Sequence, residues 1–197
     1  NVRKDEIKVD GWEFEKAVLA YADAAGERQE VQLGAYQTDF VTKGAETFQV
    51  VYVGKGGEKD YADKDVTGKI VLAEINQRDE WWINFPVYQA HEKGAKALIA
   101  VQIGGYGQVD EKALNAQDIA GPPEAAAFSM SFEDSEKLKA FLDEKGEITV
   151  TLDASSRVMR DVSTYNILGE IPGRRSDRMI LLSAHYDSYF SGFQDDN

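Results

Sequence analysis

Three side chains near the end of this 197-residue sequence have the types and the order of a metal-binding site. His185 and Asp187 follow the apolar run 179–184 directly, and Asp195 lies a few residues further on. Imidazole and carboxylate groups are common zinc ligands in proteins. The pattern predicts metal-assisted hydrolysis, in which a metal ion activates a water molecule.

The run 179–184 predicts how these groups are held. A short, almost continuous apolar run is typical of a strand buried on both faces, and functional groups of open α/β sheets gather at the carboxyl ends of such strands. Alternate residues of a strand share a face, so Asp187 is expected to orient the imidazole of His185, which itself binds the metal. A carboxylate has two oxygens, so Asp195 is able to bridge two zinc ions.

Three short motifs of the sequence resemble the co-catalytic di-zinc aminopeptidases, a family that also contains glutamate carboxypeptidase and the transferrin receptor ectodomain. The motifs are Tyr-Asn-Ile-Leu-Gly-Glu-Ile-Pro-Gly at 165–173, Met-Ile-Leu-Leu-Ser-Ala-His-Tyr-Asp-Ser at 179–188, and Gly-Phe-Gln-Asp-Asp at 192–196. Their order and spacing match the family. The resemblance implies a zinc exopeptidase that acts on peptide or protein substrates.

The resemblance also implies a role for each candidate residue. It makes His185 a zinc ligand, Asp187 the residue that holds this histidine, and Asp195 the bridge between two zinc ions. The family needs further ligands and a general-base Glu, which come from a Glu-Glu pair, another acid and a second His downstream. We therefore expect this chain to be a piece of a larger enzyme that binds zinc weakly by itself, hydrolyses nothing, and needs the remainder of the catalytic domain.

Composition narrows the possible partners and locations. The 22 basic and 35 acidic residues give a net charge of −13, which disfavours binding to nucleic acids and to anionic membranes. No apolar run approaches the roughly 20 residues of a membrane span, and the sequence has no cysteine for disulfides or thiolate sites. Together with the family resemblance, this predicts a soluble protein that is secreted or held at the cell surface.

The middle of the sequence predicts a small α/β module. The residue types favour strands at 48–54, 69–75, 97–101, 125–130 and 148–152, and helices at 85–93 and from Ser131 to about 145. A strand, a helix and a further strand in succession predict a parallel pair with a crossover. Ser131 is suited to cap the second helix at its start and Gly146 to end it.

This module resembles the protease-associated domain, chiefly through residues 66–72 and 93–101. In the aminopeptidase family this domain is commonly inserted near the start of the catalytic domain. We therefore expect an N-terminal flank at 1–45, a protease-associated domain with a mixed sheet and flanking helices at 46–154, and the truncated start of the catalytic α/β domain at 155–197. Within the last part, residues 165–171 and 178–184 are expected to form an antiparallel pair.

Trp81, Trp82 and Phe85 form an aromatic group ahead of the first predicted helix. Such a group either lines a substrate entrance or packs inside the module. In the family the protease-associated domain resembles a lid over the catalytic cleft, which favours a role in substrate access.

Two classes of function stay open at this point. The first is a zinc aminopeptidase, with a glutamate-type carboxypeptidase not distinguished from it. The second is a non-catalytic interaction module, because the receptor ectodomain has the same architecture without peptidase activity. The retention of His185, Asp187 and Asp195 together favours the enzyme.

Overall fold

The computed structural model describes residues 1–76, 78, 84–105, 110–114, 121–122, 124–175 and 177–185. The described strands form a nine-stranded mixed sheet in the order β2-β1-β9-β5-β6-β7-β8-β3, with β4 paired to β9 beside this path. The strands are β1 (Val2–Ala22), β2 (Arg28–Gln32), β3 (Gly34–Ala35), β4 (Phe40–Val41), β5 (Glu46–Tyr52), β6 (Ile70–Asn76), β7 (Ala97–Gly104), β8 (Ala127–Met130) and β9 (Glu147–Gly169). The helices are η1 (Glu58–Tyr61), α1 (Phe85–Glu92) and α2 (Phe132–Lys145).

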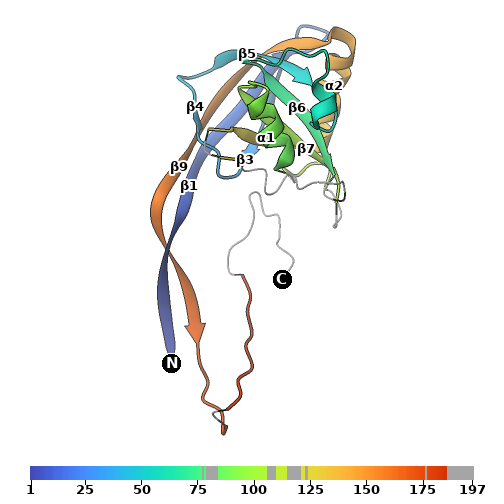
Figure 1. Ribbon diagram of the computed structural model, residues 1–197. Helices are drawn as coiled ribbons and strands as arrows, with labels where there is room; N and C mark the ends of the chain where they lie inside the picture. Colours follow the sequence, from blue (N-terminus) through green and yellow to red (C-terminus); the bar gives the residue numbers. More distant parts are fainter. Residues whose placement is uncertain are drawn as a thin grey trace.

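The sheet curls until its two ends almost meet, which makes a barrel (Figure 1). The end strands β2 and β3 are consecutive in the chain and are separated by Leu33 alone. The backbone N–H of Leu33 donates to the carbonyl oxygen of Ala17 in β1 at 2.9 Å. One short stretch of chain therefore pairs with β1 through β2 and with β8 through β3.

The strands at the centre of the sheet are buried on both faces. In β6, Ile70 and Leu72 point into the barrel core, which also includes buried residues of β1, β9 and α2. Val71 and Ala73 of the same strand point to a second core beneath α1. Strands β5, β6, β7 and β8 run parallel to one another, as expected for strands covered on both faces.

The predicted mixed α/β module is confirmed, including the parallel pair of β6 and β7 joined through α1. The predicted ends of α2 are confirmed as well. The Ser131 hydroxyl accepts a hydrogen bond from the backbone N–H of Asp134 at 3.2 Å, and Gly146 ends the helix at φ 79°. No helix in the described part of the chain is long and apolar enough to cross a bilayer.

The longest strands, β1 and β9, extend well beyond the barrel. They pair antiparallel from Tyr21↔Val150 inside the barrel to Val2↔Gly169 at the far end. Their outer halves project from the barrel as a two-stranded ribbon (Figure 1). Strand β9 runs across the predicted limit between 154 and 155, and the division into 1–45, 46–154 and 155–197 stays a prediction.

The predicted antiparallel pairing of 165–171 with 178–184 is wrong. Residues 165–169 belong to β9, and the register pairs Tyr165 with Glu6 and Leu168 with Arg3 of β1. Segment 178–184 is irregular. The N-terminal strand, distant in sequence, provides the hydrogen-bonding partner that the sequence analysis assigned to the nearest apolar run.

Candidate functional site

One of the three predicted metal-site residues lies within the described residues. His185 ends the described chain, and its side chain is exposed. Asp187 and Asp195 lie outside the described residues. The roles of His185 and Asp195 as zinc ligands, and of Asp187 as the residue that orients the imidazole, therefore stay predictions.

The strand predicted to carry His185 is not formed. Met179, Ile180, Leu181 and Leu182 are 84%, 91%, 78% and 90% exposed. An apolar strand of this kind is stable only when neighbouring strands pair with its edges and other layers cover its faces. The described part of the chain provides neither for segment 179–184, so the segment stays extended and uncovered.

The described residues contain no group of three or more His, Asp or Glu side chains that is able to hold a metal ion. His185 has the donor chemistry that zinc prefers, and its exposure keeps the imidazole outside the hydrophobic cores. A catalytic zinc ion normally has three protein ligands and a water molecule. The described chain thus contributes one candidate ligand and not a complete site.

Phe85, the described member of the predicted aromatic group, is half-buried at the start of α1. Trp81 and Trp82 lie outside the described residues. Phe85 follows the connection that begins at the carboxyl end of β6, where Asn76 is paired with Gly104 of β7. A Cβ atom on Gly104 would lie 2.7 Å from Asn76 Nδ2, so the two strand ends are closely packed. Carboxyl ends of parallel strands are where ligand sites of α/β sheets collect.

A polar cluster that the sequence analysis missed joins β5, β6 and α2. The Tyr52 hydroxyl donates to Glu74 Oε2 at 2.5 Å, and Lys139 Nζ donates to Glu74 Oε1 at 2.7 Å. The Lys139 ammonium also lies 5.2 Å from the centroid of the Tyr52 ring. Parallel pairing places Tyr52 opposite Leu72 of β6. Glu74 is the next residue on the same face of β6. Nothing in the sequence indicated that α2 would bring Lys139 to them.

The electrostatics of this cluster favour a structural role. Burial, followed by the hydrogen bond to Glu74, raises the pKa of Tyr52 to about 12. The Glu74 carboxylate raises the pKa of Lys139 as well. At neutral pH the tyrosine is therefore protonated and the lysine charged, and both hydrogen bonds to Glu74 hold α2 to the sheet.

An open hollow of about 400 Å³ lies beside the start of α2. Its lining consists of Gln32, Asp110, Lys112, Ala113, Leu114, Ser131 and Asp134. The Ser131 hydroxyl donates to Asp134 Oδ2 at 2.8 Å, so the two polar groups nearest the helix end are occupied by the cap. The hollow does not contain the ligands of a metal site.

Several solved peptidase structures are similar to this chain. An aminopeptidase from Aneurinibacillus sp. strain AM-1 matches 91% of this chain, with a TM-score of 0.62 and 22% identity, and the match covers 40% of that protein. BSAP, a zinc aminopeptidase from Bacillus subtilis, matches 89% with a TM-score of 0.60 and 20% identity, covering 38% of it. A peptidase M28 precursor from Shewanella amazonensis SB2B matches 85% with a TM-score of 0.60 and 19% identity, covering 40% of it.

This chain has the fold of part of these peptidases. The resemblance predicted from the motifs is thereby confirmed at the level of the fold. The chain spans about two fifths of the length of the structures that it matches. No protein-family model matches the sequence, and no curated protein matches it either.

Proposed function

We propose that this chain is part of a zinc-dependent aminopeptidase and that it does not hydrolyse peptides by itself. The observation that carries the proposal is the shared fold, which extends over 85% to 91% of this chain in three bacterial peptidases. The sequence motif around His185 supports the same reading.

In this proposal His185 and Asp195 hold zinc, and Asp187 accepts the other imidazole N–H of His185 so that the ring keeps one orientation. Asp195 bridges two zinc ions in the complete enzyme. Bound zinc would supply an activated water for hydrolysis of the peptide bond next to a free N-terminus. The remaining ligands and the general base would come from the rest of the catalytic domain.

We further propose that the barrel is a protease-associated domain that shapes substrate access, with Trp81, Trp82 and Phe85 near the entrance. The placement of Phe85 after the carboxyl end of β6 supports this role. Trp82→Ala in the complete enzyme should raise KM for peptide substrates. Lower stability with unchanged kinetics would leave Trp82 with a packing role alone. A secreted or cell-surface location is part of the same proposal.

The decisive experiment compares two histidine variants of the full-length protein. The sequence printed here contains two histidines, so His91→Ala is a matched control for His185→Ala. His91 is half-buried near the end of α1 and lies in a different part of the chain from the proposed ligands. We expect two zinc ions and turnover of aminoacyl anilides in the unmodified protein and in His91→Ala, with both lost or strongly reduced in His185→Ala.

A folded full-length protein without zinc and without turnover would overturn the proposal and favour a non-catalytic interaction module. Equal zinc content and equal turnover in the two variants would retain an enzyme but remove His185 from its site.

A further inference from the structure

The pairing of β1 with β9 changes register twice as the strands leave the barrel. One shift lies between Phe14 and Lys16, where β1 has an extra residue, Glu15. The other lies opposite Asp10, where β9 has an extra residue at positions 160–161. The two bulges are on opposite strands and cancel, so the outer ribbon returns to the register of the barrel.

The first bulge keeps one apolar face continuous with the barrel core. Ala17 and Leu19 point into that core, and Phe14 packs against it because the extra residue restores its side chain to the same face. The opposite face is polar at this level. On that face Lys16 Nζ contacts Asp153 Oδ2 at 2.7 Å, and both side chains are partly exposed.

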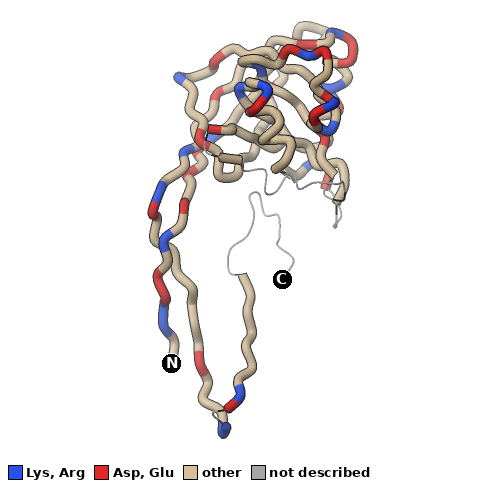
Figure 2. The backbone as a smooth tube through the Cα atoms, viewed as in Figure 1, with Lys and Arg blue, Asp and Glu red and all other residues tan. Residues whose placement is uncertain are grey.

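Beyond the second bulge both faces of the ribbon carry polar and apolar side chains. The face continuous with the barrel core now carries charge, since Lys8 Nζ donates to Ser163 Oγ at 2.5 Å and Ser163 Oγ donates to Glu6 Oε1 at 2.5 Å. Further along the same face, Lys4 Nζ lies 5.4 Å from the centre of the Tyr165 ring. Figure 2 shows that the charged residues of the outer ribbon lie along β1.

The other face of the ribbon has an apolar patch next to the second bulge, and we call this patch the ribbon face. It consists of Ile7, Val9, Met159 and Val162, with Val9 directly opposite Val162. Beyond the patch the same face is polar, since Arg3 and Asp5 form an ion pair on it. Ile7 is 41% exposed, and Val9 and Met159 are each 39% exposed. In the barrel the same side of these strands is polar, so the ribbon face does not continue the barrel core.

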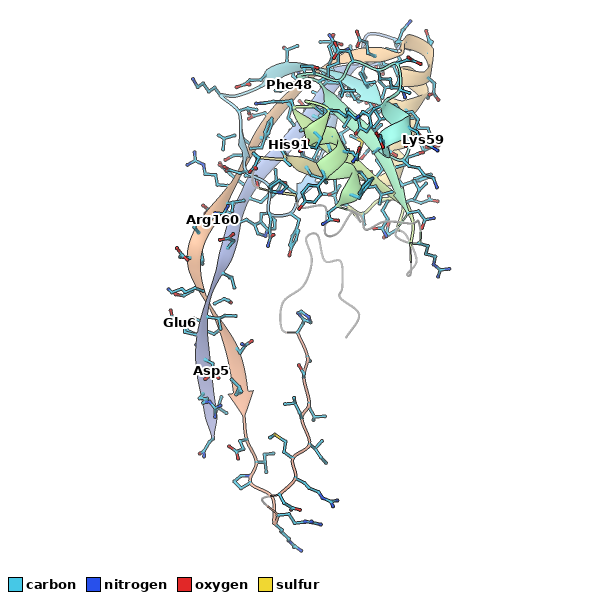
Figure 3. The ribbon with its side chains drawn as sticks, in the orientation of Figure 1. Asp5, Glu6, Phe48, Lys59, His91 and Arg160 are labelled. Atoms are coloured by element: carbon cyan, nitrogen blue, oxygen red, sulfur yellow. The ribbon has the colours of Figure 1, made fainter. Side chains whose placement is uncertain are left out.

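The second bulge creates this face. Without the extra residue, Val162 would pair with Lys8, which would place it on the charged side. Asp161 adopts a left-handed conformation at φ 56°, and Arg160 forms an ion pair with Asp10 across the bulge. Figure 3 shows Arg160 at the point where the ribbon leaves the barrel. The bulge thus brings Val162 to the same side as Val9.

We propose that the ribbon face is the surface on which the rest of the aminopeptidase chain packs, on the opposite side of the β1–β9 ribbon from the barrel core. This inference rests on the proposed function. A two-stranded ribbon is marginally stable alone in water and needs a covering layer. The structures that this chain matches are more than twice as long as the matched part, so a large part of such a chain is available to supply that layer.

The course of the chain after β9 supports the same occupant. After a turn that contains the Arg175–Asp177 ion pair, the chain runs back along the ribbon towards His185 (Figure 1). This returning stretch carries the uncovered apolar run 179–184. No described residue covers the ribbon face or this run. One additional layer of chain would bury both.

Single cysteines test the inference directly, because the sequence contains no cysteine. Val9→Cys reports on the ribbon face, and Lys8→Cys is its matched control on the charged face. Each variant is made in the 197-residue chain and in the full-length protein, and maleimide labelling is followed at that peptide by mass spectrometry. We expect fast labelling at both positions in the short chain, and labelling at position 9 about tenfold or more slower in the full-length protein, with position 8 unchanged.

Equal labelling rates at position 9 in the short and full-length proteins would overturn the inference, as would equal slowing at positions 8 and 9. Slowing at position 9 that appears in the short chain as its concentration rises would identify a second copy as the occupant and would also overturn it. Zinc content and turnover, measured on the same preparations, separate the two proposals. An active zinc enzyme with fast labelling at position 9 refutes the ribbon face alone, and slow labelling without zinc or turnover refutes the peptidase.

The bulge provides a second variant pair. Deletion of Asp161 should restore fast labelling at position 9 in the full-length protein, because it moves Val162, the partner of Val9, to the other face and breaks up the ribbon face. Asp161→Gly keeps the left-handed conformation accessible and should retain the slow labelling. Slow labelling in both variants would show that the bulge does not define the ribbon face.

Discussion

The inner and outer halves of β1 should respond very differently to the same truncation of an apolar side chain. Leu19 is fully buried, and its neighbours in the sheet are Val31 of β2 and Leu152 of β9. Ile7 lies in the outer ribbon with 41% of its surface exposed. We compare Leu19→Ala with Ile7→Ala in the 197-residue chain.

The expected loss for Leu19→Ala follows from its surroundings. Paired strands lie on both sides of Leu19, and they limit how far the structure is able to collapse into the space that the side chain leaves. The lost transfer free energy and the remaining cavity together cost about 3–5 kcal/mol. A domain of this size has roughly 5–15 kcal/mol of stability, so the variant would lose a large share of it. Ile7→Ala should cost less than about 1 kcal/mol in this chain because Ile7 already contacts water.

Urea unfolding followed by circular dichroism at 25 °C measures both values, provided that the m-value is unchanged. A loss below about 1 kcal/mol for Leu19→Ala would show that the first strand is not part of the barrel core. A loss for Ile7→Ala as large as that for Leu19→Ala would show that the ribbon is covered in this chain, which would contradict the exposed ribbon face.

Three further predictions follow from individual contacts. The pKa of Tyr52 is raised from 10.0 to about 12, so between these pH values the folded protein keeps a proton that the unfolded chain releases. The urea midpoint of unfolding should therefore fall as pH rises from 10 towards 12, and Tyr52→Phe should weaken that fall. Gly56→Ala should lower stability by about 1–3 kcal/mol in urea titrations, because Gly56 has φ 72° and a Cβ there would lie 2.9 Å from Pro86 Cβ. The control Gly26→Ala, at φ 81° in open space, should cost about 1 kcal/mol, and equal losses in the two variants would refute the contact with Pro86. Ser156 is fully buried and its hydroxyl donates to the Thr38 carbonyl oxygen at 2.6 Å, so Ser156→Ala should cost about 1–3 kcal/mol by the same titration, and no loss would show that water replaces the hydroxyl.

Local signals in the sequence were sufficient for the middle of the chain. The run that became β6 is apolar because it is buried on both faces, and a β-branched or aliphatic run of this kind has few alternatives. Ser131 and Gly146 mark the ends of α2 through short-range hydrogen bonding and backbone conformation. These features depend on neighbours within a few residues, so the sequence alone predicts them.

Long-range pairing was not accessible in the same way. Residues 165–169 carry a clear strand signal, but the choice of β1 as their partner depends on Val2–Ala22, more than a hundred residues earlier. The bulge at Asp161 has no local sequence signal, because the residue adopts a left-handed conformation without being a glycine. For the candidate site, the motif predicts which residues bind zinc, but the strand before His185 forms only when other strands and layers cover it.

The barrel and the segment that leads to the predicted metal site differ in how completely the described residues surround them. The barrel core is closed by residues from β1 to β9, so the barrel contains the neighbours that its own strands need. The ribbon face and segment 179–184 present apolar side chains away from that core, and no described residue covers them. His185 directly follows this uncovered segment. We therefore expect the barrel to fold separately from the proposed zinc site, and a substitution on the ribbon face should impair assembly of that site without unfolding the barrel.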